Sequence, residues 1–139
     1  MTVIAIDASS LAKYFLKEKG WRDVRDLIDA RSPVYSVDLV VKEVANAVWK
    51  RVKILKSMDE DRAQLLFESL LELVEKNVIV LEPEGEYIRK AYRISMMENV
   101  TVYDSLYVAL AEKLGELVTS DKAQAEIAAK HGVKTLFIP

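Results

Sequence analysis

The first ten residues constrain the fold of this chain more than any other stretch. An unbroken apolar run at residues 3–6 ends at Asp7, and Ser9 and Ser10 then open an apolar-periodic segment. A short apolar run bounded by turn residues predicts a buried strand, and the serines predict a helix that starts directly after it. Asp7 is therefore expected at the carboxyl end of a central strand, which is the edge where ligands bind in open α/β sheets.

The alternation of strand and helix continues along the chain. Further strands are expected at residues 34–37, 78–81, 117–119 and 133–138. Helices are expected at residues 11–16, 21–31, 38–55, 58–76, 86–97 and 123–131, with Gly20 as the stop of the first of them. Strands that alternate with helices favour a parallel, doubly wound sheet. We therefore predict an α/β fold, a three-layer α/β/α domain with about five parallel strands that spans residues 1–139.

The composition excludes several kinds of chemistry. The 139 residues include no Cys and one His, so disulfides, thiolate zinc sites, cysteine nucleophiles and histidine-rich metal sites are excluded. No segment approaches the length of about 18 apolar residues that a membrane span needs, and the N-terminus lacks a signal-peptide pattern. A soluble, cytoplasmic protein is expected. The net charge of -2 argues against nucleic-acid binding by bulk positive charge, unless a cation bound among the acids attracts phosphate.

Four of the 22 acidic residues stand out because of their apolar surroundings. Asp7 and Asp121 each follow an apolar strand, whereas Glu43 and Asp104 are expected on helices among apolar neighbours. Right-handed crossovers bring strands that are distant in sequence side by side, so the two strand-end acids can converge. Clustered carboxylates in a partly dry cleft repel one another, and a divalent cation relieves that repulsion. Ligands that offer only oxygen favour Mg²⁺ or Mn²⁺.

A metal site of this kind suits phosphodiester hydrolysis, because the cation binds phosphate oxygens and lowers the pKa of a bound water. In that interpretation Asp7 and Asp104 are direct ligands, while Glu43 and Asp121 hold a bound water or a second ion. Each acid also has a purely structural interpretation. Asp7, Asp104 and Asp121 could cap helices, the last through a capping box with Gln124, and Glu43 could pair with a lysine or arginine.

Four segments in order carry a family pattern. They are Ile-Asp-Ala-Ser at 6–9, Val-Lys-Glu-Val-Ala-Asn-Ala-Val-Trp at 41–49, Val-Tyr-Asp-Ser-Leu-Tyr-Val-Ala-Leu-Ala at 102–111 and Leu-Val-Thr-Ser-Asp at 117–121. Together, in this order and spacing, they resemble the PIN-domain ribonucleases, and within them the VapC toxins of prokaryotic toxin–antitoxin modules. The resemblance implies a Mg²⁺- or Mn²⁺-dependent endoribonuclease that cleaves single-stranded or looped RNA. It also implies a homodimer that a cognate VapB-like antitoxin inhibits.

The resemblance also assigns individual residues. The acids of the family fall on Asp7, Glu43, Asp104 and Asp121, and its supporting polar positions fall on Ser9, Asn46 and Thr119. None of the four acids is replaced in this chain. The fourth acid of the family varies in identity and role, so the match at Asp121 is the least specific.

The surface of the chain offers further candidates. Lys50 and Arg51 belong to a basic cluster near the end of the Glu43 helix, where cations could meet RNA phosphate or simply form a solvated helix face. Trp49, Tyr103 and Tyr107 could stack on bases, but aromatic residues in such apolar stretches belong more often to a core or an interface.

Apolar stripes predict self-association. The stripes at residues 11–16 and 65–74 exceed what a core of this size needs, which favours a homodimer. His131 precedes Gly132 at an expected helix end, and it is given no catalytic role.

Three other functions stay open at the level of sequence. A PIN-type nuclease of RNA processing or quality control would have no antitoxin gene beside its own. A catalytically silent RNA-binding module would bind a cation without cleaving RNA. A phosphatase with an aspartyl nucleophile would act on small phosphoesters and hardly on RNA.

Overall fold

The central sheet consists of parallel strands, as the alternating pattern predicts. The computed structural model describes residues 3–139. Five strands lie in the order β3-β2-β1-β4-β5, and each neighbouring pair is parallel. Their bounds are β1 (Ala5–Ile6), β2 (Val34–Val37), β3 (Ile79–Glu82), β4 (Glu116–Thr119) and β5 (Lys134–Phe137). The predicted count of about five strands is confirmed.

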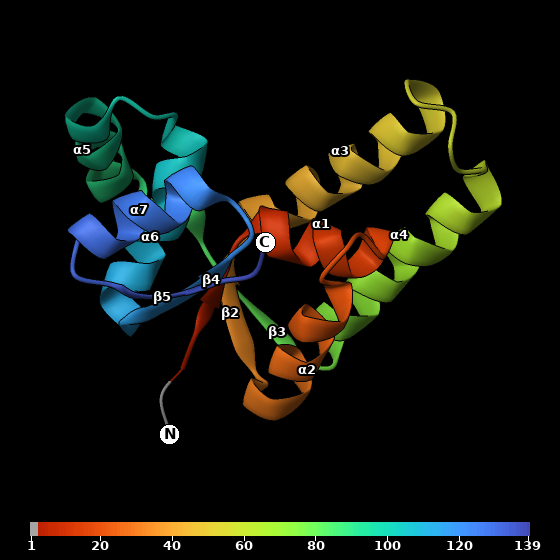
Figure 1. Cartoon of the computed structure of the whole chain (residues 1–139), viewed down its shortest axis with the longest axis horizontal. Helices are drawn as coiled ribbons and strands as arrows, with labels where there is room; N and C mark the ends of the chain where they lie inside the picture. Colours follow the sequence, from red (N-terminus) through yellow and green to blue (C-terminus); the bar gives the residue numbers. More distant parts are fainter. Residues whose placement is uncertain (1–2) are drawn as a thin grey trace.

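Helices cover both faces of the sheet, which gives the predicted three layers. Figure 1 shows α5, α6 and α7 gathered on one side of the sheet and α1 to α4 on the other. The helices are α1 (Ala8–Leu16), α2 (Trp21–Arg31), α3 (Leu39–Lys53), α4 (Glu60–Glu75), α5 (Ile88–Glu98), α6 (Val102–Leu114) and α7 (Lys122–Lys130), with a 3-10 turn at Glu84–Glu86. No helix within residues 3–139 combines the length and apolar character needed to cross a membrane.

The centre of the sheet is β1, and its register places the end of the strand beside the end of β4. Ile6 pairs with Val118, and the Asp7 N–H donates to the Val118 carbonyl oxygen at 3.3 Å. On the other side the Ser36 hydroxyl donates to the Ile6 carbonyl oxygen at 2.7 Å. Ile4, Ala5 and Ile6 are all fully buried, as expected for a central strand that helices cover on both faces. The residues that follow β1 and β4 must therefore meet at one edge.

The first helix ends at Leu16, as predicted, but the residue that stops it differs from the prediction. Helix α1 ends at Leu16 because Lys17 adopts a left-handed conformation with φ of 53°, so Gly20 is not its stop. Gly20 instead precedes α2, with φ of +93°. A Cβ atom at this position would lie 2.9 Å from the Pro139 carbonyl oxygen. Glycine is therefore required here by backbone conformation and by the close approach of the C-terminal residue.

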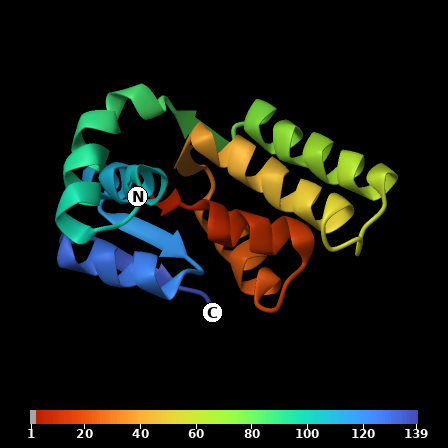
Figure 2. The same cartoon turned by 90° about the horizontal axis from the view of Figure 1, so that it is seen from above.

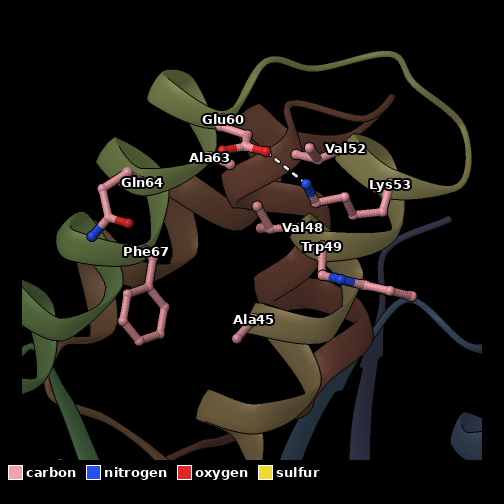
Figure 3. Close-up of a pocket in the computed structure, with 9 residues that line it drawn as sticks. All are labelled: Ala45, Val48, Trp49, Val52, Lys53, Glu60, Ala63, Gln64 and Phe67. Carbon is pink, nitrogen blue, oxygen red and sulfur yellow. Dashed lines mark hydrogen bonds and ion pairs between the residues drawn. The ribbon is translucent and has the colours of Figure 1, made fainter.

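Helices α3 and α4 form a hairpin that reaches away from the sheet (Figure 2). A pocket of about 250 Å³ opens between them, lined by Ala45, Val48, Trp49, Val52, Lys53, Glu60, Ala63, Gln64 and Phe67. Figure 3 shows apolar side chains from both helices along this pocket, with the Lys53–Glu60 ion pair of 2.6 Å at one end. The apolar stripes of the hairpin are thus only partly used by the core.

His131 joins the three helices on the other side of the sheet. Its Nε2 lies 2.9 Å from Glu98 Oε2 at the end of α5, and its Nδ1 lies 2.9 Å from Glu112 Oε1 on α6. The three side chains are largely buried. His131 thus uses both ring nitrogens to contact carboxylates of two other helices. The sequence places His131 at a helix end, and the structure adds this bridge.

We expect the His131→Gln substitution to lower the melting temperature by several degrees, because it disrupts hydrogen bonds to two largely buried carboxylates. Thermal unfolding followed by circular dichroism at pH 7 measures this. Lys130→Gln is the control, because Lys130 pairs with the same Glu98 from an exposed position and should contribute little. Equal melting temperatures for His131→Gln and the wild type would show that the bridge does not stabilise the fold.

Candidate active site

Asp7 is the most constrained acid of the chain. Its side chain is only 3% exposed, and it caps the N-terminus of α1 by accepting a hydrogen bond from the Ser10 N–H at 3.2 Å. The same oxygen, Oδ1, accepts from the Ser9 hydroxyl at 2.6 Å. The other oxygen, Oδ2, accepts from the Thr119 hydroxyl at 2.5 Å. Asp7 is thus a helix cap, as one interpretation of the sequence held, and its carboxylate is also fixed by donors from two strand ends.

Burial dominates the acidity of Asp7. Desolvation raises the pKa of this carboxyl from 3.8 to about 6, although the hydrogen bonds from Ser9, Thr119 and Ser10 act to lower it. The nearby charge of Asp121 raises the pKa slightly further. The ionised form of Asp7 is therefore under-stabilised by the protein alone. A bound cation would favour that form.

Hydroxyl groups tie the start of α1 to the loop after β4. The oxygens of Ser9 and Thr119 lie 3.3 Å apart, and the Ser120 N–H donates to Ser9 Oγ at 2.9 Å. The Ser10 and Ser120 hydroxyls form a second link of 2.9 Å. Ser9 and Thr119 both contact Asp7, and their supporting role in a metal site stays a prediction. The sequence does not mark Ser10 and Ser120 as site residues, because a serine near a helix start usually acts as a cap.

Asp121 is the N-cap of α7 and is exposed. Its Oδ1 accepts hydrogen bonds from the N–H groups of Ala123 at 2.9 Å and Gln124 at 3.2 Å. The capping interpretation is therefore correct for Asp121, but the reciprocal arm of a capping box is absent from residues 121–124. The buried Gln124 side chain instead donates to the Asp104 carbonyl oxygen at 2.9 Å, which ties the two acid-bearing segments together.

Asp104 lies in the first turn of α6 and does not cap it. The cap is Thr101, whose hydroxyl oxygen accepts from the Asp104 N–H at 3.2 Å, so the capping interpretation of Asp104 is wrong. The side chain of Asp104 is half-buried. Burial raises the pKa of its carboxyl, and the charge of Asp121 raises it further.

Glu43 lies on α3 and has a neutral partner. The Tyr107 hydroxyl of α6 donates to Glu43 Oε1 at 2.5 Å. No lysine or arginine within residues 3–139 forms an ion pair with Glu43, so the salt-bridge interpretation is wrong for this part of the chain. Partial burial raises the pKa of the Glu43 carboxyl, and the nearby charge of Asp104 adds to the rise.

The four acids influence one another electrostatically. Asp121 raises the pKa of both Asp7 and Asp104, and Asp104 raises the pKa of Glu43. In the described part of the chain, no basic side chain pairs with any of the four. Mutual repulsion without a counter-charge fits a site that a cation completes.

The side chains do not by themselves form a closed cage. Within residues 3–139, no three Asp, Glu or His side chains come together closely enough to enclose a metal ion. Mg²⁺ is usually held by one or two carboxylates and keeps several of its waters. The oxygen-only donors of Asp7, Glu43, Asp104 and Asp121 therefore fit a hydrated Mg²⁺ or Mn²⁺.

The remaining predicted site residues lie on α3. Asn46 is exposed one turn after Glu43, and its side chain makes no hydrogen bond with the described residues. Lys50 is exposed, whereas Arg51 donates to Glu18 Oε2 at 3.0 Å and is partly neutralised there. A contact of Lys50 and Arg51 with RNA stays a prediction.

The aromatic candidates behave differently from one another. Tyr107 is only 2% exposed and belongs to the core, as expected for such an apolar stretch. Trp49 and Tyr103 are 51% and 61% exposed, so neither belongs to the core of the chain. Tyr103 neighbours Asp104 on α6, and Trp49 lines the pocket between α3 and α4.

Comparisons with known proteins show the family of this chain. The family model of the PIN domain matches residues 4–130, so the chain belongs to the PIN domain family. A relative, ribonuclease VapC3 from Pyrobaculum aerophilum, is 32% identical over 124 residues, which is 88% of this chain and 92% of that protein. Together the two findings support a nuclease of the VapC type.

A solved structure confirms the architecture. The crystal structure of PAE2754 from Pyrobaculum aerophilum aligns with a TM-score of 0.69 at 23% sequence identity. The match covers 96% of this chain and 90% of the other. At this level of identity the likeness concerns the fold, and it supports the parallel three-layer arrangement.

Proposed function

We propose that this protein is an endoribonuclease that depends on Mg²⁺ or Mn²⁺, cleaves single-stranded RNA and acts as the toxin of a VapBC-type toxin–antitoxin module. One observation supports it most strongly. A buried carboxylate, Asp7, is oriented by three donors beside other acids, with no basic counter-charge among the described residues. The family membership and the similarity to a ribonuclease give the same class of reaction.

In this proposal each residue has a defined task. Asp7 and Asp104 would bind the cation directly, and the hydroxyls of Ser9 and Thr119 hold Asp7 in place. Glu43 and Asp121 would orient a water for attack on phosphorus or help to hold a second ion. A divalent cation held here supplies the positive charge that binds phosphate oxygens and makes water more acidic. This local positive charge would also offset the net charge of -2 of the chain when RNA approaches.

The Asp104→Asn substitution is expected to reduce RNA cleavage by about 10²-fold or more, because even supporting residues of metal sites typically contribute 10–100-fold. Cleavage of an end-labelled single-stranded RNA with Mn²⁺, Mg²⁺ or EDTA measures the loss. Asp23→Asn is the control, since Asp23 occupies the first turn of α2 as an exposed acid outside the site. Equal cleavage by Asp104→Asn and the wild type would contradict the assignment.

An RNA duplex of the same sequence should be cleaved much more slowly.

A homodimer is part of the proposal. The stripe at residues 11–16 no longer supports it, because Leu11 and Phe15 belong to the core. Other apolar side chains do, since Tyr92 and Met96 lie one turn apart on α5 and are both exposed. Sedimentation equilibrium at micromolar concentration should give about twice the chain mass of 15.8 kDa. A constant monomer mass would rule the dimer out.

The proposed antitoxin partner and place of action follow from the toxin role. A VapB-like protein encoded beside this gene would suppress the cleavage activity. The apolar pocket between α3 and α4 offers surface for such a partner. A toxin that cleaves cellular RNA would act in the cytoplasm. If no antitoxin gene adjoins this one but cleavage is confirmed, an RNA-processing nuclease becomes the better description.

A further inference from the structure

We propose that Tyr107 is a positioning residue that fixes the Glu43 carboxylate through a hydrogen bond between α6 and α3. The inference rests on the proposed function, because it gives Glu43 a task in the metal site. No role of Tyr107 follows from its position in the sequence, where it reads as a core aromatic.

The hydrogen bond is short and its donor is buried. Tyr107 Oη lies 2.5 Å from Glu43 Oε1, and Tyr107 is 2% exposed. Within residues 3–139, each of the two side chains hydrogen-bonds only to the other. A buried tyrosine hydroxyl needs a partner, and a half-buried carboxylate needs a donor. The two requirements are met by a single bond, which therefore determines where the Glu43 carboxylate lies.

The bond engages one oxygen of Glu43 and leaves the other free. Oε1 accepts from Tyr107, whereas Oε2 has no hydrogen-bond donor in the described residues. Glu43 is therefore arranged to make one further contact through Oε2. Burial, the hydrogen bond to Glu43 and the charges of Glu43, Asp7 and Asp104 all raise the pKa of the Tyr107 hydroxyl. The hydroxyl stays a donor at physiological pH.

Helix α6 connects this bond to the rest of the site. Asp104 and Tyr107 are three positions apart on α6, so they lie on the same side of the helix. The first two turns of α6 thus contribute one acid directly and orient a second acid that belongs to α3. The relative positions of Glu43 and Asp104 therefore depend on how the fold places α3 and α6.

Tyr87 provides a matched comparison elsewhere in the fold. It is 6% exposed, and its hydroxyl donates to Glu82 Oε1 at 3.0 Å, so it forms the same kind of bond away from the four acids. A loss of the Tyr87 hydroxyl should weaken the fold without touching the metal site. Any effect of Tyr107→Phe that Tyr87→Phe lacks therefore belongs to the site and not to the general loss of a buried hydroxyl.

Titration of the full-length protein with Mn²⁺ in a calorimeter tests the proposal. Tyr107→Phe should weaken Mn²⁺ binding by about 10–100-fold, as expected when a supporting partner of a ligand is lost. It should lower kcat for RNA at fixed Mn²⁺, leave KM for RNA unchanged, and regain activity at high Mn²⁺. Tyr87→Phe should bind Mn²⁺ and cleave RNA like the wild type. Melting temperatures establish that both variants are folded.

A double-mutant cycle separates positioning from other effects. If Tyr107 acts through Glu43, then Tyr107→Phe should change Mn²⁺ affinity by less than about twofold once Glu43→Gln is present. Unchanged Mn²⁺ affinity of the single variant, or fully additive effects in the cycle, would overturn the role of Tyr107 while leaving the nuclease intact. A wild-type protein that binds no Mn²⁺ would overturn the proposed function and this inference together.

Discussion

Replacing Asp7 by Asn is expected to reduce RNA cleavage by about 10²-fold or more. The variant should nevertheless be at least as stable against unfolding as the wild type. The loss of activity follows from removing the charge that would bind the cation. The stability follows from burial, because the ionised carboxylate is 3% exposed and lacks a cationic partner in the described residues. A neutral amide of the same shape avoids that cost and can still accept from Ser9 and Ser10.

Cleavage of labelled RNA and thermal unfolding in EDTA measure the two halves of this prediction. Asp59→Asn is the matched control, because Asp59 also caps a helix, by accepting from the Arg62 N–H at 2.8 Å, but it is exposed and outside the site. The control should keep full activity. A large loss of stability in Asp7→Asn would mean that the carboxylate serves the fold, as a cap, more than it serves a metal site.

The pH dependence of stability should carry the signature of Asp7. Its pKa is raised from 3.8 to about 6, so the folded protein holds this proton more tightly than the unfolded chain does. The stability that this group contributes is therefore full below about pH 4 and is lost as pH rises through 6. A difference of about two units between the folded and unfolded pKa corresponds to at most roughly 3 kcal/mol in the free energy of unfolding.

Denaturant unfolding in EDTA at pH 4.5, 5.5, 6.5 and 7.5 measures this loss. The relevant quantity is the difference in unfolding free energy between the wild type and Asp7→Asn. Using the difference cancels the other groups that titrate in both proteins. As pH rises, the free energy of unfolding of Asp7→Asn should increase relative to that of the wild type. Mn²⁺ at pH 7.5 should restore the stability of the wild type. Parallel curves for the two proteins would show that the Asp7 pKa is not raised.

The arrangement of the sheet and the place of Asp7 could be predicted because they depend on local patterns. The apolar run before Asp7 and the serines after it determine a strand, a turn and a helix without reference to the rest of the chain. The edge shared with Thr119 then follows from parallel pairing of β1 and β4. Glu43 and Asp104 are indicated by their apolar neighbours on expected helices, and the family resemblance assigns both to the site.

Contacts between distant helices could not be predicted from the pattern. The Tyr107–Glu43 bond joins residues 64 positions apart, and a tyrosine rather than a lysine reaches Glu43 because of where the fold places α6 relative to α3. The same holds for the bridge that His131 makes to Glu98 and Glu112. The residue that stops α1 could not be predicted either, because Lys17 ends the helix by a left-handed φ that is unusual for lysine.

The most direct test of the metal-dependent nuclease is metal restoration. Purified protein is stripped with EDTA, freed of chelator, and titrated with Mn²⁺ while cleavage of a labelled single-stranded RNA is followed. We predict no cleavage before Mn²⁺ is added, saturable recovery as it is added, and no recovery for Asp7→Asn. Cleavage by the stripped protein that Mn²⁺ does not change would contradict the account, as would the absence of cleavage at every metal concentration.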